Sequence, residues 1–222
     1  MEYHKIETLY ERDLTGAVHW SEKTYKLNPE LILKNPIYGV IKTWHWTEKI
    51  DGTNVRCIWN HAEQKVSFAG RTDKAQIHAD LVRWLYRNVS NIELRQTFPD
   101  VDVIIYGEGY GAGIQKGGGD YSPTKKLVVF DILVVDSKNS CFGGWWLNWE
   151  NTCDVARKLS LETVPYLGEM RLEKAVELVR TGFPSQLNHG KARAEGIVGR
   201  TFEALFDKKG HRLITKLKTK DF

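Results

Sequence analysis

The chain has 222 residues, of which 41% are hydrophobic and 27% charged, a balance typical of a soluble globular protein of one sizeable domain or two small ones. No apolar run reaches the roughly 18–20 residues that a membrane-spanning helix needs, and the polar N-terminus does not resemble a signal peptide. Only three cysteines occur, without a CxxC pair, which argues against a disulfide scaffold or zinc ribbon and predicts a cytoplasmic protein.

The net charge of +4 is small, but it is unevenly distributed along the chain. From Lys191 to Phe222, nine Lys and Arg residues stand against four acidic ones, so this segment alone carries +5. A basic surface suits a phosphate-bearing partner, although a solvated strand and turn would have the same composition. Charge alone therefore leaves both interpretations open.

Hydrophobic periodicity predicts ten main elements. In chain order they are strands at 43–49, 53–59 and 65–71, a helix at 75–87, strands at 101–108 and 126–135, helices at 151–159 and 172–180, and strands at 195–201 and 212–218. Asp73 is the expected cap of the first helix, and Gly182 is the expected stop of the third. Because strands outnumber helices and do not alternate with them, we expect an α+β fold with antiparallel sheets.

The segment Glu48-Lys-Ile-Asp-Gly-Thr-Asn54 lies between two predicted strands and places Lys49 at a strand end. A lysine amine becomes a nucleophile only when neighbouring cations or loss of water favour its neutral form. Asp-Gly is also a strong hairpin dipeptide, so this segment by itself equally fits an ordinary β-turn.

Other strand ends carry groups that would complete a nucleotide site. The chain offers an arginine, two carboxylates and an aromatic ring, namely Arg71, Glu108, Glu195 and Phe130. It also offers two lysines, Lys216 and Lys218, on one face of the last predicted strand. A nucleoside triphosphate with a divalent metal fits this set of residues. The GxGxxA pattern at 107–112 lacks a following helix, and no GxxxxGK[ST] occurs, so neither a dinucleotide fold nor a Walker loop is expected.

The ordered set KIDG, GRT, YGEG, FDI, EGIVGR and KLK resembles motifs I, Ia, III, IIIa, IV and V of the covalent nucleotidyltransferases, which include DNA ligases, RNA ligases and capping enzymes. The likeness extends from about Lys5 to Phe222. Asn54, in the form KxDGxN, is similar to RNA ligase 2-type enzymes, whereas DNA ligases usually show KxDGxR. The resemblance implies an ATP-grasp-like nucleotidyltransferase fold, with two antiparallel sheets flanked by helices around a central nucleotide cleft.

The resemblance also implies residue roles. Lys49 would attack the α-phosphate of ATP and hold AMP, while Lys216 and Lys218 would contact that phosphate and stabilise its developing charge. Glu195 would bind magnesium, with manganese as an alternative.

Five further residues receive binding roles in the same way. Phe130 would stack on adenine, and Glu108 would hydrogen-bond the ribose. Arg71 and Asn54 would engage the ribose or the phosphate at the junction to be sealed, and Glu48 would line the adenine pocket.

The implied function is ATP-dependent ligation of RNA ends that carry a 5′-phosphate and a 3′-hydroxyl, with DNA or an RNA/DNA hybrid as the other substrate candidates. One alternative is a DNA nick ligase or a 5′-end adenylyltransferase of the same superfamily. A second alternative is a degenerate domain that only binds nucleic acid.

We expect residues 1–222 to form one nucleotidyltransferase domain with no C-terminal OB-fold or other accessory domain, in a bacterial or phage-infected cytoplasm and without a membrane partner. A protein partner, the basic C-terminal segment or the glycine-rich loop Gly117–Gly119 would then replace that domain. The tryptophans of the patch at 141–150 are expected to pack in the core and at a helix start, with base stacking as the less favoured use.

Overall fold

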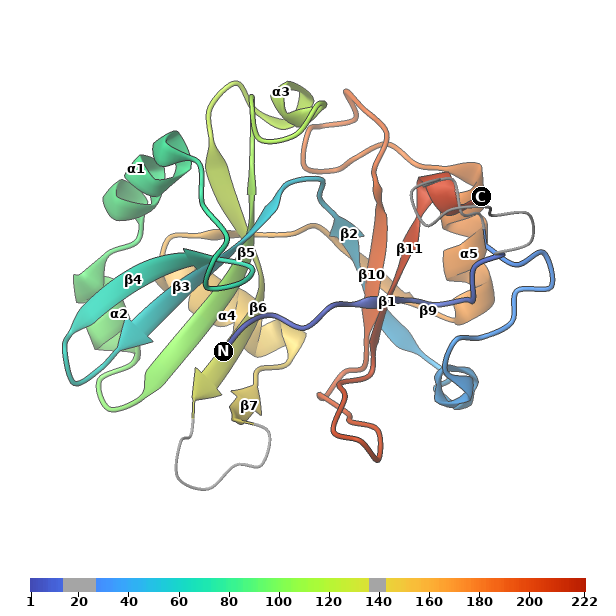
Figure 1. The fold of residues 1–222 in the computed structure, drawn as a ribbon, viewed down its shortest axis with the longest axis horizontal. Coiled ribbons are helices and arrows are strands. Elements are labelled where there is room, and N and C mark those ends of the chain that lie inside the picture. Colours follow the sequence, from blue (N-terminus) through green and yellow to red (C-terminus); the bar gives the residue numbers. More distant parts are fainter. Residues whose placement is uncertain (14–26, 136–142) are drawn as a thin grey trace. The chain divides into compact units, whose positions relative to one another are not determined.

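The computed structural model describes residues 1–13, 27–135 and 143–222 (Figure 1). They form two compact units. The first unit combines Met1–His4 with Ile50–Val164, and the second combines Lys5–Lys49 with Pro165–Phe222. Each unit contains its own sheet and its own apolar core, so each is described by itself.

The first unit contains a six-stranded sheet with the order β4-β3-β5-β6-β7, and β8 pairs with β6. All pairings are antiparallel except the parallel one between β6 and β8. The strands are β3 (Thr53–Asn60), β4 (Lys65–Gly70), β5 (Asp102–Tyr110), β6 (Lys126–Val135), β7 (Gly144–Trp146) and β8 (Glu162–Thr163). The helices are α1 (Ala79–Asn88), α2 (Asn91–Thr97), α3 (Gly118–Tyr121) and α4 (Trp149–Lys158).

The core of the first unit lies between this sheet and its helices. Leu81 and Leu85 of α1 are fully buried, since a spacing of four residues places them on one helix face. They belong to the same cluster as Val55, Cys57 and Ile105, which alternate inward along β3 and β5. The strand patterns of the sequence therefore correspond to real inward and outward faces.

The second unit contains a five-stranded sheet with the order β1-β11-β10-β2-β9. Its pairings are antiparallel except that β1 runs parallel to β11. The strands are β1 (Glu7–Thr8), β2 (Trp44–Lys49), β9 (Tyr166–Met170), β10 (Gly196–Arg200) and β11 (Ile214–Lys218). Helix α5 (Leu172–Thr181) and two 3₁₀ turns, η1 (Pro36–Val40) and η2 (Thr219–Asp221), complete the unit.

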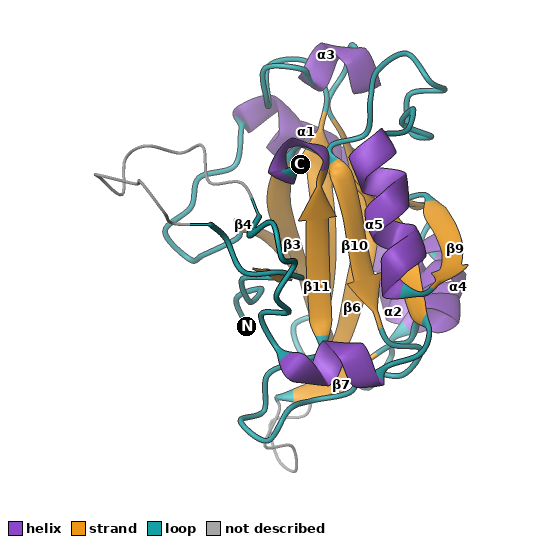
Figure 2. Cartoon of the chain, turned by 90° about the vertical axis from the view of Figure 1, so that its right-hand side faces the viewer, coloured by secondary structure: helices purple, strands orange, loops and turns teal. Residues whose placement is uncertain are grey.

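Helix α5 covers one face of this sheet (Figure 2). Its buried residues Ala175 and Val179 share a core with Trp44, Trp46 and other apolar strand residues. Strand side chains point alternately to the two faces, so His45, Thr47 and Lys49 point away from α5. This alternation leaves the opposite face of β2 to polar residues, with Lys49 at its end.

The predicted α+β fold class is confirmed, and each of the seven predicted strands forms with ends that differ by at most two residues. The predicted start of the first helix, at residue 75, is wrong: the helix begins at Ala79, and the side chain of His78 caps it. Asp73 instead accepts a hydrogen bond from Arg56 Nη2 at 2.7 Å, which holds it in the preceding loop. The short elements β1, β7, β8, β9, α2, α3 and both 3₁₀ turns were not anticipated from periodicity.

Two expectations about loops changed. The glycine-rich segment is not simply a loop, because Gly118–Tyr121 forms the one-turn helix α3. In the tryptophan patch, Trp149 is buried at the start of α4, as expected, whereas Trp145 is 61% exposed. Cys141 and Phe142 of that patch lie outside the described residues. None of the helices in the described ranges is long and apolar enough to cross a membrane.

Gly199 supplies a test of packing in the second unit. It lies opposite Trp46 in the β2–β10 ladder, and a Cβ at this position would lie 2.6 Å from the indole ring. We expect Gly199→Ala to lower the free energy of unfolding by about 1–3 kcal/mol, measured by urea denaturation. Gly119→Ala is the control, since its Cβ would meet only Ala112 at 3.9 Å. Equal losses in the two variants would contradict this account of Gly199.

Candidate active site

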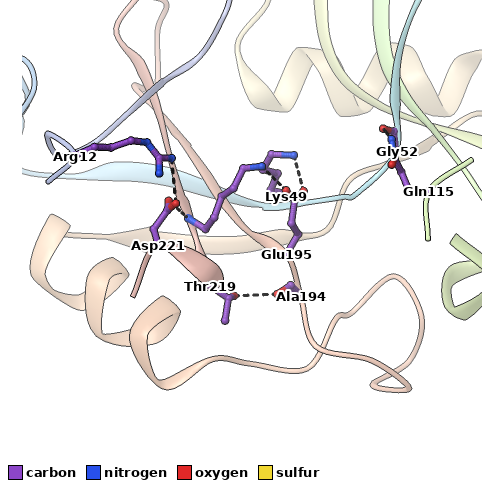
Figure 3. Close-up of polar contacts among 9 residues, drawn as sticks. Arg12, Lys49, Gly52, Gln115, Ala194, Glu195, Thr219 and Asp221 are labelled. Carbon is purple, nitrogen blue, oxygen red and sulfur yellow. Dashed lines mark hydrogen bonds and ion pairs between the residues drawn. The ribbon is translucent and has the colours of Figure 1, made fainter. Parts of the chain in front are cut away.

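Three charged residues meet at one end of the second sheet (Figure 3). Lys49 ends β2, Lys218 ends β11, and Glu195 comes immediately before β10, which lies between them. Lys49 Nζ donates to Glu195 Oε2 at 2.6 Å, and Lys218 Nζ donates to Glu195 Oε1 at 2.6 Å. One carboxylate thus holds two ammonium groups, and we call these three residues the lysine–glutamate cluster.

The ladder register explains why these side chains coincide. Gly196 lies directly opposite both Lys49 and Lys218, on its two neighbouring strands. A Cβ on Gly196 would lie 2.1 Å from the carbonyl oxygen of Leu217 and 2.7 Å from Lys218 Cα. Only glycine allows β10 to approach β11 this closely, and the approach places Glu195 within reach of Lys218.

The charge state of Glu195 follows from its surroundings. Burial alone would raise its pKa, but the charge of Lys49 and hydrogen bonds from Lys218 and Lys49 outweigh burial and lower the pKa below its ordinary value. Glu195 is therefore an ionised carboxylate at neutral pH. Charge-assisted hydrogen bonds of this kind are short and strong, which agrees with the two 2.6 Å distances.

Lys216 adds a third cation on the same face of β11 as Lys218. Its ammonium group makes no hydrogen bond or ion pair with any residue that the structure describes. Burial first, and then the charges of Lys218 and Lys49, together lower the pKa of Lys216 to about 8, against the opposing effect of Glu195. Three lysines with one carboxylate leave an excess of positive charge, which favours an anion such as a polyphosphate.

Glu48 lies apart from this cluster, although it neighbours Lys49 in sequence. Its side chain is 1% exposed, and its carboxylate accepts hydrogen bonds from Ser185 Oγ and the backbone N–H of Gln186. Burial raises the pKa of Glu48, and these hydrogen bonds partly offset the rise. The structure therefore uses the Glu48 carboxylate to hold the loop at 185–187 and does not bring it to Lys49.

The remaining predicted residues belong to the first unit. Asn54 and Glu108 are direct partners across β3 and β5, so they share one face, and Asn54 Oδ1 is buried without a hydrogen-bond partner among the described residues. Arg71 is exposed just after β4. The structure thus brings together Lys49, Glu195, Lys216 and Lys218 in one unit, and Asn54 with Glu108 in the other.

Phe130 occupies a β-bulge that the sequence did not indicate. Tyr106 pairs with Asp131 and Gly107 pairs with Val129, so Phe130 is the extra residue of β6. Bulges re-aim side chains and are common beside functional sites. The Tyr3 ring packs edge-on against the Phe130 ring, with centroids 5.1 Å apart.

Sequence reasoning missed Gln115. Its side-chain amide donates to the carbonyl oxygen of Gly52 at 2.9 Å, in the turn that follows Lys49 (Figure 3). That turn packs tightly on β5, because a Cβ on Gly52 would lie 2.2 Å from the carbonyl oxygen of Gly109. The only hint in the sequence was the position of Gln115 a few residues after the YGEG motif.

The described residues contain no group of three or more His, Cys, Asp or Glu side chains arranged to hold a metal ion. Magnesium, however, is commonly bound through one or two carboxylates together with substrate phosphates and water. Glu195 fits that mode as a single ionised carboxylate, beside lysines that would face the same phosphates.

Lys216 makes the stability of the protein depend on pH. Its pKa is 10.5 unfolded and about 8 folded, so between these values the unfolded chain binds more protons and stability rises with pH. We expect Lys216→Met to be more stable than the wild type below pH 8, with a gain that shrinks as pH rises toward 10.5. Urea denaturation at a series of pH values measures both. Lys209→Met, at an exposed lysine, is the control, and a pH-independent gain at Lys216 would contradict the prediction.

Comparison with known proteins places this site in a family. A family model described as RNA ligase matches residues 42–218, whereas a search of curated proteins found no match. The fold is similar to solved structures of Naegleria gruberi RNA ligase. A point variant with ATP and Mn shares 19% identity over 80% of this chain and 50% of that chain, with a TM-score of 0.61. The Naegleria gruberi ligase with pyrophosphate shares 19% identity over 80% of this chain and 49% of that chain, with a TM-score of 0.60.

The chain thus spans about half the length of the solved structures it matches. The family model, in contrast, covers most of this chain and includes every member of the lysine–glutamate cluster. The chain belongs to the RNA ligase family.

Proposed function

We propose that the chain is an ATP-dependent RNA ligase that joins 5′-phosphate and 3′-hydroxyl ends through a lysyl-AMP intermediate. The observation that carries this proposal is the lysine–glutamate cluster, which lies within the segment matched by the RNA ligase model. The solved relatives also support it, since they were studied with ATP and Mn, with AMP and Mn, and with pyrophosphate. Nucleotidyl transfer consumes ATP, transfers AMP and releases pyrophosphate.

In the first step the Lys49 amine attacks the α-phosphorus of ATP, and the bond to pyrophosphate breaks. The proton of the Lys49 ammonium lies within hydrogen-bond reach of Glu195 Oε2, at 2.6 Å between the heavy atoms. Lys216 and Lys218 stabilise the negative charge that develops on the phosphate oxygens. A magnesium ion held by Glu195 and the phosphates would neutralise further charge there.

The next two steps use the same cations. AMP passes from Lys49 to the 5′-phosphate of the RNA, and the 3′-hydroxyl then attacks that activated phosphate and expels AMP. Each step is an in-line displacement at phosphorus, so placement of groups and cationic stabilisation supply most of the catalysis. We assign Phe130 and Glu108 to the nucleoside, and Arg71 and Asn54 to the ribose or the junction phosphate.

The first test is covalent labelling with α-labelled ATP and magnesium. We expect label that remains on the denatured protein, and we expect Lys49→Ala to abolish it because no amine remains to attack. Lys209→Ala, at an exposed lysine outside the cluster, serves as the control and should label like the wild type. Label that persists in Lys49→Ala would show that another residue is the nucleophile.

The second test is end joining on nicked duplexes whose 3′-hydroxyl strand is either RNA or DNA. We expect sealing with RNA at that position, because the chain belongs to the RNA ligase family. Sealing of DNA alone would favour a DNA nick ligase, and AMP transfer without sealing would favour a 5′-end adenylyltransferase. RNA binding without any lysine-bound AMP would favour a nucleic-acid-binding module.

A further inference from the structure

We propose that Arg12, Thr219 and Asp221 are positioning residues, which hold the 3₁₀ turn η2 so that Lys218 and Glu195 meet Lys49 in a fixed geometry (Figure 3). The effect on adenylyl transfer rests on the proposed function. The effect on the placement of Lys218 and Glu195 does not depend on that function, because it concerns contacts within the second unit alone.

Thr219 secures the backbone that carries Glu195. Its backbone N–H donates to the carbonyl oxygen of Glu195 at 2.9 Å, and its hydroxyl donates to the carbonyl oxygen of Ala194 at 3.0 Å. The β10–β11 ladder ends one step earlier, at the pair Gly196 and Lys218. Thr219 therefore extends the connection between these two segments to the residue that bears the carboxylate.

Asp221 secures the backbone of Lys218. Its Oδ2 accepts from the Lys218 backbone N–H at 3.0 Å, and its Oδ1 accepts from Arg12 Nη2 at 3.1 Å. The Asp221 side chain is 1% exposed, so water does not compete for these hydrogen bonds. A buried carboxylate needs a cationic partner, and Arg12 provides it.

The turn is also anchored at points remote from the cluster. The carbonyl oxygen of Asp221 accepts from the backbone N–H of Leu27 at 3.2 Å. The ring of Phe222 lies under the guanidinium of Arg180 on α5, 5.2 Å from its centroid. These anchors give η2 a position that is set independently of the Glu195 ion pairs.

Thr219 and Asp221 make their hydrogen bonds to backbone groups and to Arg12, and none to the Lys49 amine. They act through Lys218 and Glu195, whose long side chains need a fixed backbone to place their charged ends. A displacement of about 1 Å in such groups costs on the order of a hundredfold in rate.

The decisive variant is Asp221→Asn, which keeps the shape of the side chain but removes its charge. At saturating ATP we expect lysyl-AMP formation to slow about ten- to a hundredfold, while the KM for ATP changes much less. Asp154→Asn is the matched control, because Asp154 is a partly exposed carboxylate of α4 whose ion pairs, with Arg157 and Lys158, lie outside the second unit. It should react at the wild-type rate.

Coupling to Lys218 separates positioning from general destabilisation. If Asp221 acts through Lys218, adding Asp221→Asn to Lys218→Ala causes no further loss of rate. If the rate losses of the two single variants multiply in the double variant, the proposal is overturned. Should Asp221→Asn fold poorly, Thr219→Val and Arg12→Lys test the same turn with smaller changes, and wild-type rates in both would also overturn it.

Amine acetylation read by mass spectrometry tests the geometry without ATP. An ammonium held in an ion pair acetylates slowly, so Asp221→Asn should make Lys218 several-fold more reactive and leave exposed Lys209 unchanged. Unchanged reactivity of Lys218 in this variant would overturn the positioning proposal. Increased reactivity in a protein that forms no lysine-bound AMP would instead uphold positioning and refute the ligase function.

Discussion

The sharing of one carboxylate by two ammonium groups is the interaction on which the candidate site depends. Lys49 and Lys218, at the ends of the two strands that flank β10, would repel each other if Glu195 did not lie between them. The close approach at Gly196 makes this possible. Lys216 stays outside the arrangement, and the resulting surplus of positive charge is what an incoming phosphate would relieve. This end of the second sheet therefore carries more positive than negative charge.

The sequence predicted the lysine–glutamate cluster because its three residues lie at strand ends. Alternation along 43–49, 195–201 and 212–218 gave the strands, and the motifs gave the cluster that the structure assembles. Alternation also places Glu48 and Lys49 on opposite faces of β2, which explains why the two side chains have different hydrogen-bond partners.

Other features depend on contacts between distant segments, which periodicity does not contain. Helix α1 begins at Ala79, where His78 caps it, while Asp73 lies in the preceding loop and accepts a hydrogen bond from the distant Arg56. The bulge at Phe130 depends on the register between β5 and β6, and no local pattern announces it. The hydrogen bond from Gln115 to Gly52 likewise joins positions 63 residues apart.

The hydrogen bonds of Glu48 have a consequence for how the chain can vary in length. The segment from Ser185 to Glu195 is tied at its start to Glu48 and at its end to Lys49, two consecutive residues of β2. Together with the peptide bond between Glu48 and Lys49, these two contacts close a ring. Surface loops usually accept insertions, but here an added residue would strain the ring unless it entered at the exposed tip, at 189–191, away from both attachments.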